Sequence, residues 1–292
     1  MDQEDVARAA ERIAPYARWT PLVRVAVEGR EVLLKLDHMQ LSGSFKLRGA
    51  LNALLGADER PTAVVTASGG NHGAAVATAA RLLGIPATVY VPESVPAAKA
   101  AMIERQGARL VRHGVTYAEA AAAATAVEDA AYLPAFDHPL VVAGQGTCAA
   151  EILADAPGVE SVFVAVGGGG LAAGTALNGL PVVAVEPTRC RALNAAIEAG
   201  LPVETDVDSV TASALGASKL GQVPFEVLSA AKVESVLVED SAIVAARDLL
   251  WQEFRLAVEL AAAAPLAAWL QRRDPGLAAL IICGGNADWF PA

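Results

Sequence analysis

Short runs of apolar and β-branched residues alternate along this chain with longer, alanine-rich stretches. The apolar runs predict strands at residues 63–66, 87–91, 109–112, 161–166, 182–185, 236–238 and 280–283. The alanine-rich stretches predict helices at residues 73–83, 97–106, 117–130, 146–155 and 241–263. Strands that alternate with helices in this way indicate an α/β protein whose mostly parallel sheets are flanked by helices.

One stretch, residues 161–185, carries no charge and is long enough to cross a bilayer. Four consecutive glycines at 167–170 and a proline at 181 divide it into pieces that are too short to span. The stretch therefore predicts two buried strands around a glycine loop and a helix. We expect no membrane segment.

Composition and charge narrow the possible partners and the compartment. The chain has 292 residues, 54% of them hydrophobic, and 22 basic against 32 acidic residues give a net charge of −10. An acidic surface repels nucleic acid, so a small-molecule substrate is favoured. The acidic N-terminus lacks the pattern of a signal peptide, and Cys148, Cys190 and Cys283 match no disulfide or zinc spacing. We expect a cytoplasmic protein.

A lysine stands where a helix is expected to begin, in the segment Q-L-S-G-S-F-K-L-R-G-A at residues 40–50. Ser42 or Ser44 would cap a helix entered at Phe45, which places Lys46 in the first turn. Cations are disfavoured at this end of the helix dipole, so a lysine with a lowered pKa, or one that is covalently engaged, fits the position. The alternative is a solvated surface lysine.

A second motif, T-A-S-G-G-N-H-G at residues 66–73, leads from a strand through glycines into a helix. Ser68, Asn71 and His72 offer polar side chains there, and the first N–H groups of the helix suit a carboxylate or a phosphate. The alternative is a capped helix entry without a ligand.

The glycines at 167–170 follow the strand V-F-V-A-V and precede a helix, so bare backbone amides could surround a phosphate. Gly167, Gly169 and Ala172 also fit a loose dinucleotide-binding pattern. Glu186 ends the next strand, 18 residues after Gly168, near the position of a ribose-binding acid. A nicotinamide-dependent dehydrogenase is therefore a competing hypothesis.

The last motif, I-I-C-G-G-N at residues 281–286, is another strand that enters a glycine turn. Cys283 is interpreted either as a small buried hydrophobic residue or as a weak hydrogen-bond partner for a ligand.

Taken in this order, the motifs resemble those of the serine/threonine dehydratase group of the fold-type II pyridoxal-phosphate enzymes, the tryptophan synthase beta-like family. The resemblance extends from Thr20 to Asn286 and includes G-Q-G-T at 144–147 followed by Glu151. It implies two lobes, each a mostly parallel sheet flanked by helices: a large cofactor-binding domain of residues 1–52 and 140–292, and a small substrate-clamping domain of residues 53–139. A dehydrogenase has no need of the first two motifs, so this resemblance disfavours it.

The resemblance also implies a role for each matched residue. Lys46 would bind pyridoxal phosphate covalently and later remove the α-proton, and Phe45 would lie against one face of the ring. Asn71 would bond to the ring's 3-oxygen, and Cys283 would face the pyridine nitrogen as a neutral group. The phosphate would be held by Gly167, Gly168, Gly169, Gly170 and Leu171. The substrate carboxylate would be held by Ser68, Gly69, Asn71 and His72.

Two positions refine this picture. Racemases of the family carry a serine where this chain has Gly69, so the second acid-base group that inversion requires is missing here. Glu186 matches the family's cation-binding glutamate, but Ala192 replaces the aspartate of the members that bind divalent ions. A monovalent cation such as K⁺, held by Glu186, Cys190, Leu215 and Ala217, is therefore expected, with a purely structural glutamate as the alternative.

The function that the resemblance implies is an ammonia-lyase, a homodimer without a regulatory domain, that eliminates water from L-serine or L-threonine and yields a 2-oxo acid and ammonia. One alternative is the same chemistry on 3-hydroxyaspartate or phenylserine. A second carboxylate needs a cation, so the positions of Arg48, Arg112 and Lys219 bear on this alternative. Serine racemase and a non-catalytic amino-acid-binding protein are less favoured, the latter because Lys46 is retained.

Overall fold

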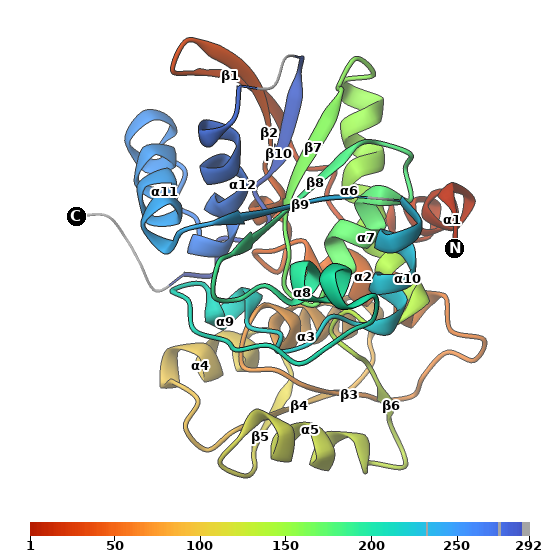
Figure 1. The fold of residues 1–292 in the computed structure, drawn as a ribbon. Helices are drawn as coiled ribbons and strands as arrows, with labels where there is room; N and C mark the ends of the chain where they lie inside the picture. The colour runs from red at the N-terminus through yellow and green to blue at the C-terminus, as the bar shows by residue number, and fades with distance from the viewer. Residues whose placement is uncertain (232, 274–275, 288–292) are drawn as a thin grey trace.

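The computed structural model describes residues 1–231, 233–273 and 276–287 and contains two β-sheets in two lobes (Figure 1). The larger sheet has the order β1-β2-β10-β7-β8-β9, in which the β1–β2 hairpin is antiparallel and every other pairing is parallel. Its strands are β1 (Leu22–Val27), β2 (Arg30–Lys35), β7 (Ser161–Ala165), β8 (Val182–Pro187), β9 (Glu234–Val238) and β10 (Ala278–Ile281).

The smaller sheet is wholly parallel, in the order β5-β4-β3-β6. Its strands are β3 (Val64–Ala67), β4 (Ala87–Val91), β5 (Arg109–Arg112) and β6 (Ala131–Tyr132). Helices α3 (Asn71–Leu83) and α4 (Ala97–Arg105) lie on the side of this sheet that faces the larger lobe, and α5 (Tyr117–Thr125) lies on the far side (Figure 1). All four strands fall within residues 53–139, while the domain boundaries themselves stay a prediction.

Helices cover both faces of the larger sheet, with α11 and α12 on one side and α6, α7 and α10 on the other (Figure 1). The larger lobe contains α1 (Gln3–Ile13), η1 (Asp37–Met39), α2 (Lys46–Leu55), α6 (Pro139–Asp155), α7 (Gly170–Ala176), α8 (Ala192–Ala199), α9 (Ala212–Leu215), α10 (Gln222–Ala231), α11 (Asp240–Phe254) and α12 (Leu260–Gln271). Because helices cover both faces, the inner strands are buried on both sides, as their unbroken apolar sequences indicate. The predicted fold class, α/β with mostly parallel sheets, is confirmed.

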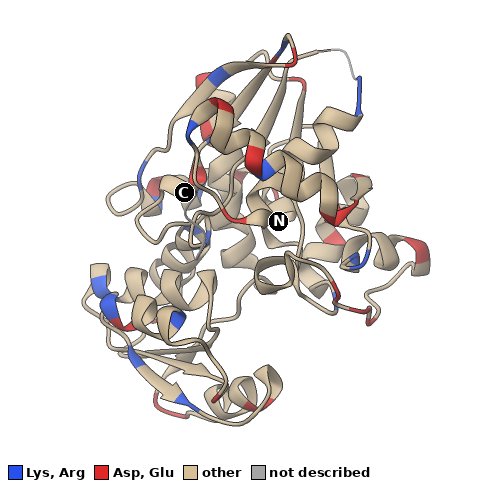
Figure 2. Ribbon diagram, turned by 90° about the vertical axis from the view of Figure 1, so that its left-hand side faces the viewer, with Lys and Arg blue, Asp and Glu red and all other residues tan. Residues whose placement is uncertain are grey.

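The uncharged stretch forms β7, α7 and β8, as predicted. In the described part of the chain, no helix has both the length and the apolar character that crossing a membrane requires. Figure 2 shows the charged residues mainly on outer helices, turns and strand ends.

The prediction of one helix over residues 241–263 was wrong. Arg255 adopts a left-handed conformation with φ 56° and ends α11, and its N–H bonds to the carbonyls of Leu250 and Trp251. The next residues form no helix, and Glu259 has an extended backbone just before α12 begins. No glycine or proline marks this break, and most residues around it favour a helix, so the sequence gives no local signal for it.

Two helix starts also differ from expectation. Neither Ser42 nor Ser44 caps α2: the N-cap residue is Phe45, without a side-chain bond, and Ser42 Oγ donates to the Ser44 carbonyl instead. Helix α6 begins at Pro139 rather than at 146, because its glycines mark close packing and not an end. A Cβ atom at Gly144 would lie 2.7 Å from the backbone of α2.

Candidate active site

A cavity of about 660 Å³ lies between the two lobes. Helix starts and strand ends from both sheets open into it, which is where open α/β sheets bind ligands. The structure brings most of the predicted site residues together there: Phe45, Lys46, Ser68, Gly69, Asn71, His72, Gly167, Gly168, Gly169, Gly170, Leu171, Leu215, Ala217 and Cys283 line it. Glu186 and Cys190 lie outside this lining.

Lys46 is the first residue of α2, as predicted, and its ammonium reaches into the cavity. Its Nζ donates to the carbonyl of Ala135 at 2.8 Å and lies 5.2 Å from the ring centre of Phe45. Burial lowers the pKa of Lys46 to about 8, although the neighbouring groups Cys283 and Glu259 act in the opposite direction. A substantial neutral fraction therefore exists near neutral pH, as a nucleophile or base requires.

The glycine loop at 167–170 packs so closely that side chains would not fit. A Cβ at Gly168 would lie 2.3 Å from the ring of Phe136, and one at Gly169, where φ is +91°, would lie 2.7 Å from Leu220. The loop leads into the N-terminus of α7, whose first N–H groups have no partner within the helix. Bare amides therefore line this end of the cavity.

The carboxylate of Glu259, which the sequence analysis missed, also lines the cavity. Its two oxygens accept from Asn71 Nδ2 at 2.8 and 2.9 Å. Burial raises the pKa of Glu259, while the hydrogen bond from Asn71 and the charges of Lys99 and Lys46 oppose the rise. The sequence predicts one continuous helix that includes Glu259, so this residue was not recognised as part of the site. The break after Arg255 places Glu259 at the cavity.

His72 contributes no positive charge. Its Nε2 lies 2.9 Å from Thr66 Oγ1 and 3.0 Å from the Leu133 carbonyl, both in the smaller lobe. Burial and the nearby charge of Lys46 lower the pKa of His72 to about 3. Ser68 Oγ accepts from the Gly70 N–H at 3.2 Å. Any carboxylate bound here would rely on backbone and side-chain hydrogen bonds rather than on an imidazolium.

Cys283 follows β10 and is buried at the cavity wall, where burial holds the pKa of its thiol well above the ordinary value. It is therefore a neutral group at physiological pH. The Phe45 N–H bonds to the Cys283 carbonyl at 2.9 Å, which ties the start of α2 to the end of β10.

Glu186 accepts the N–H groups of Leu193 and Asn194 at 2.8 Å each, so its carboxylate caps helix α8. Burial raises the pKa of Glu186 to about 7. Cys190 lies nearby, with its Sγ 3.7 Å from the Leu215 carbonyl. Among the described residues no group of three His, Cys, Asp or Glu side chains has the arrangement of a metal site. The cap supports the structural interpretation of Glu186, and the cation site stays a prediction.

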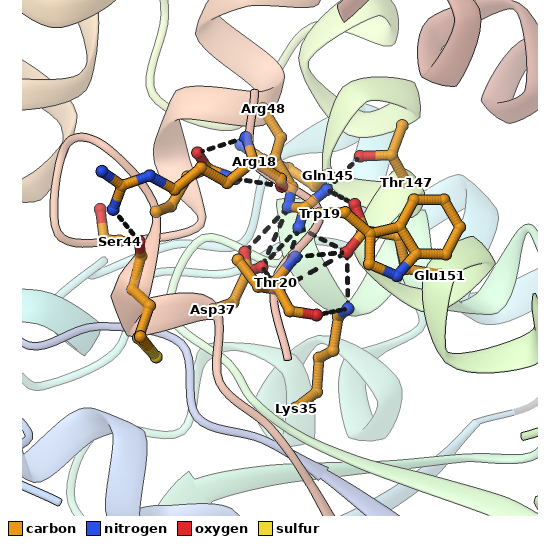
Figure 3. A network of polar contacts seen from close by, with 12 residues as sticks. Arg18, Trp19, Thr20, Lys35, Asp37, Ser44, Arg48, Gln145, Thr147 and Glu151 are labelled. Carbon is orange, nitrogen blue, oxygen red and sulfur yellow. Dashed lines mark hydrogen bonds and ion pairs between the residues drawn. The ribbon is translucent and has the colours of Figure 1, made fainter. Parts of the chain in front are cut away.

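A buried charge cluster, defined here as Thr20, Lys35, Asp37, Arg48 and Glu151, lies outside the lining of the cavity (Figure 3). Arg48 Nη2 donates to Asp37 at 2.6 Å and Arg48 Nη1 donates to Glu151 at 2.6 Å. Lys35 Nζ donates to Glu151 and to the Thr20 carbonyl at 2.5 and 2.6 Å. Two cations and two carboxylates thus cancel, and they join the N-terminal segment, β2, η1, α2 and α6.

A substrate with a second carboxylate would need a cation in the cavity, and Lys219 is the one of the three candidates that lines it. Arg48 belongs instead to the charge cluster. Arg112 Nη1 donates to the carbonyls of Glu93 and Val95 at 2.9 and 3.1 Å. Lys99, which the sequence analysis did not consider, also lines the cavity.

Comparison with known proteins agrees with this arrangement. Residues 13–284 match the family model described as pyridoxal-phosphate dependent enzyme. The L-threonine ammonia-lyase of Geobacter sulfurreducens is 37% identical over 274 residues, which cover 89% of this chain and 68% of that protein. The L-threo-3-hydroxyaspartate ammonia-lyase of Pseudomonas sp is 34% identical over 302 residues, covering 97% and 95%. The crystal structure of the T.th. threonine deaminase superposes with a TM-score of 0.94 at 36% identity and covers 100% of both chains.

Proposed function

Because this chain belongs to the family of pyridoxal-phosphate dependent enzymes, we propose that it is an ammonia-lyase that converts L-threonine or L-serine into a 2-oxo acid and ammonia. The observation that carries the proposal is the convergence of Lys46, Asn71, the glycine loop and Cys283 on one cavity. They come from segments far apart in the sequence, and each supplies a group that this cofactor needs.

The residues present fit the cofactor. Bare amides at the glycine loop and the start of α7 suit a phosphate, and glycine is required there because Phe136 and Leu220 leave no room for a Cβ. Lys46 would hold the aldehyde group, and the neutral thiol of Cys283 would face the ring nitrogen. When bound, pyridoxal phosphate withdraws electrons from the substrate's α-carbon and so stabilises negative charge there.

The protein's own groups account for the proton transfer. Lys46 Nζ, whose pKa is lowered to about 8 by burial, is neutral often enough to accept the α-proton. The substrate carboxylate would be held by Ser68, the N–H groups around Gly69 and the start of α3. The ring of Phe136, which packs against the glycine loop, would exclude water from that side of the cavity.

A second candidate is the same elimination from 3-hydroxyaspartate. Lys219 and Lys99 line the cavity and could pair with a second carboxylate. Racemisation is less favoured: Gly69 carries no acid-base group, and a Cβ there would lie 2.7 Å from Val95 Cγ2, so the neighbouring wall occupies the space.

The test is an assay of the purified protein with pyridoxal phosphate. We expect a visible absorbance band that is lost in Lys46→Ala, and 2-oxo acid formed from L-threonine or L-serine. A band with oxo acid formed faster from L-threo-3-hydroxyaspartate would move the assignment to the second candidate. The absence of a band at saturating cofactor would contradict the proposal.

The proposal extends to the setting of the enzyme. Three buried free cysteines suit a reducing cytoplasm. The exposed side chains of Trp19 and Met39 are candidates for contacts in a homodimer. Light scattering would give twice the chain mass.

A monovalent cation near Glu186 would appear as higher activity in K⁺ than in a bulky organic cation.

A further inference from the structure

Glu259 lies at one end of a directional chain of side-chain hydrogen bonds at the cavity wall, where Glu259 and Asn71 both line the cavity. Asn286 Nδ2 donates to the Ser42 carbonyl and to Asn71 Oδ1, both at 2.8 Å. A backbone carbonyl can only accept, so the Ser42 contact fixes which end of the Asn286 amide carries the nitrogen. Asn71 Oδ1 must then accept, and Asn71 Nδ2 faces Glu259.

Only one of the two N–H bonds of Asn71 can point at Glu259. The two oxygens of the carboxylate lie almost equally far from Nδ2, at 2.8 and 2.9 Å. Seen from Nδ2, they subtend a much smaller angle than the two N–H bonds of a planar amide. The second N–H is therefore left for the cavity that Asn71 lines.

The surrounding backbone makes room for this arrangement at both ends. A Cβ at Gly284 would lie 2.0 Å from Glu259 Oε1, and a Cβ at Gly43 would lie 2.1 Å from Asn286 Oδ1. Glu259 stands at the N-cap position of α12 but makes no side-chain cap bond there. Its carboxylate is thus directed to Asn71 instead of to its own helix.

We propose that Glu259 is a positioning residue for the cofactor: its carboxylate holds the Asn71 amide in the orientation that presents an N–H to the cofactor ring. The inference rests on the proposed function. Glu259 acts through Asn71, and its charge also faces Lys46, Lys99 and the neutral Cys283 across the cavity.

The experiment is a titration of the cofactor-free protein with pyridoxal phosphate, followed by absorbance, for Glu259→Ala, Asn71→Ala and the double variant. We expect Glu259→Ala to weaken cofactor binding about tenfold, because the Asn71 N–H loses its acceptor and the amide its orientation. In the Asn71→Ala background the same change should have no further effect. The exposed Glu253→Ala, on α11, serves as the matched control.

Glu259→Gln keeps an acceptor for Asn71 but removes the charge, so it should bind the cofactor within about threefold of the unaltered protein. It should also take up the cofactor at lower pH, since the Glu259 charge raises the pKa of Lys46. This variant keeps the inference testable if Glu259→Ala does not fold.

Two results would overturn the inference: unchanged cofactor affinity in Glu259→Ala, or an equal loss of affinity from this change with and without Asn71→Ala. In either case the proposed function would stand as long as the unaltered protein binds the cofactor and forms oxo acid. If the unaltered protein binds no pyridoxal phosphate, the proposed function fails as well.

Discussion

The first turn of α2 carries two basic residues, the partly buried Lys46 and the fully buried Arg48, whose charged groups have different partners. Lys46 and Arg48 are two positions apart, which places them on opposite sides of a helix. Lys46 points into the cavity and donates to the Ala135 carbonyl, and no ion pair joins it to a carboxylate in the described part of the chain. Arg48 points into the charge cluster and pairs with Asp37 and Glu151.

The difference in partners reverses the effect of burial. Burial lowers the pKa of Lys46 to about 8, because Cys283 and Glu259 offset the effect only in part. Burial would also lower the pKa of Arg48, but the charge and hydrogen bonds of Asp37 raise it well above the ordinary value. A buried cation whose charge is fully matched is a structural element, whereas one left unmatched is available for proton transfer.

The sharpest separation between the two residues is expected from Lys46→Ala. Activity should fall by a factor of about 10² to 10⁴ or more, because both the covalent link and the base are lost. Stability in urea should be unchanged or higher, since the variant no longer buries an unmatched ammonium. A fall in stability comparable to the loss expected at Arg48 would show that Lys46 is part of the framework.

Arg48→Ala should do the reverse and lower the free energy of unfolding by about 3–5 kcal/mol, because Asp37 and Glu151 would stay buried without their partner. Arg24→Ala is the control: its pair with Glu31 is more than half exposed on both sides, so the loss should be below about 1 kcal/mol. Equal midpoints in urea for the two variants would contradict the structural role of the charge cluster.

The sequence predicts the inner elements of both lobes because burial on two faces leaves long apolar runs. It misses the β1–β2 hairpin, although Glu28 and Gly29 both adopt positive φ in the two-residue turn between the strands. It also misses the end of α11, where Arg255 takes a left-handed conformation that its residue type does not predict.

The candidate site follows the same division. Asn71 and the glycine loop follow strands at glycine turns, and Lys46 follows the polar segment around Gly43 at the start of a helix, so local sequence predicts their place. The position of Glu259 in the site results from the break before α12, for which the sequence gives no signal. The position of Phe136 results from a loop between the lobes. Residues placed by tertiary packing leave no periodic signal, which is why the sequence alone could not assign them.

The two basic residues should also differ in their response to pH. Covalent uptake of pyridoxal phosphate needs the neutral amine, so its rate in the cofactor-free protein should rise through a midpoint near pH 8, instead of the ordinary 10.5 for lysine. A free lysine derivative measured in parallel corrects for titration of the cofactor. A midpoint above 10 would mean that Lys46 is solvated. Arg48 should show no titration over this range, because its pKa is raised further.

The smallest expected effect concerns a partly buried carboxylate, that of Glu259, which has an amide partner where the buried Asp37 and Glu151 have cations. Gly284→Ala would place a Cβ 2.0 Å from Glu259 Oε1 and displace the carboxylate without removing it. Affinity for pyridoxal phosphate should fall about tenfold, as for Glu259→Ala, because the Asn71 N–H loses the same acceptor. Gly158→Ala, where a Cβ meets nothing within 4 Å, should bind as the unaltered protein does. If Gly284→Ala leaves the affinity for pyridoxal phosphate unchanged, the position of the Glu259 carboxylate does not matter for cofactor binding. The contrast between a charge with an ionic partner and one without would then be supported by Lys46 alone.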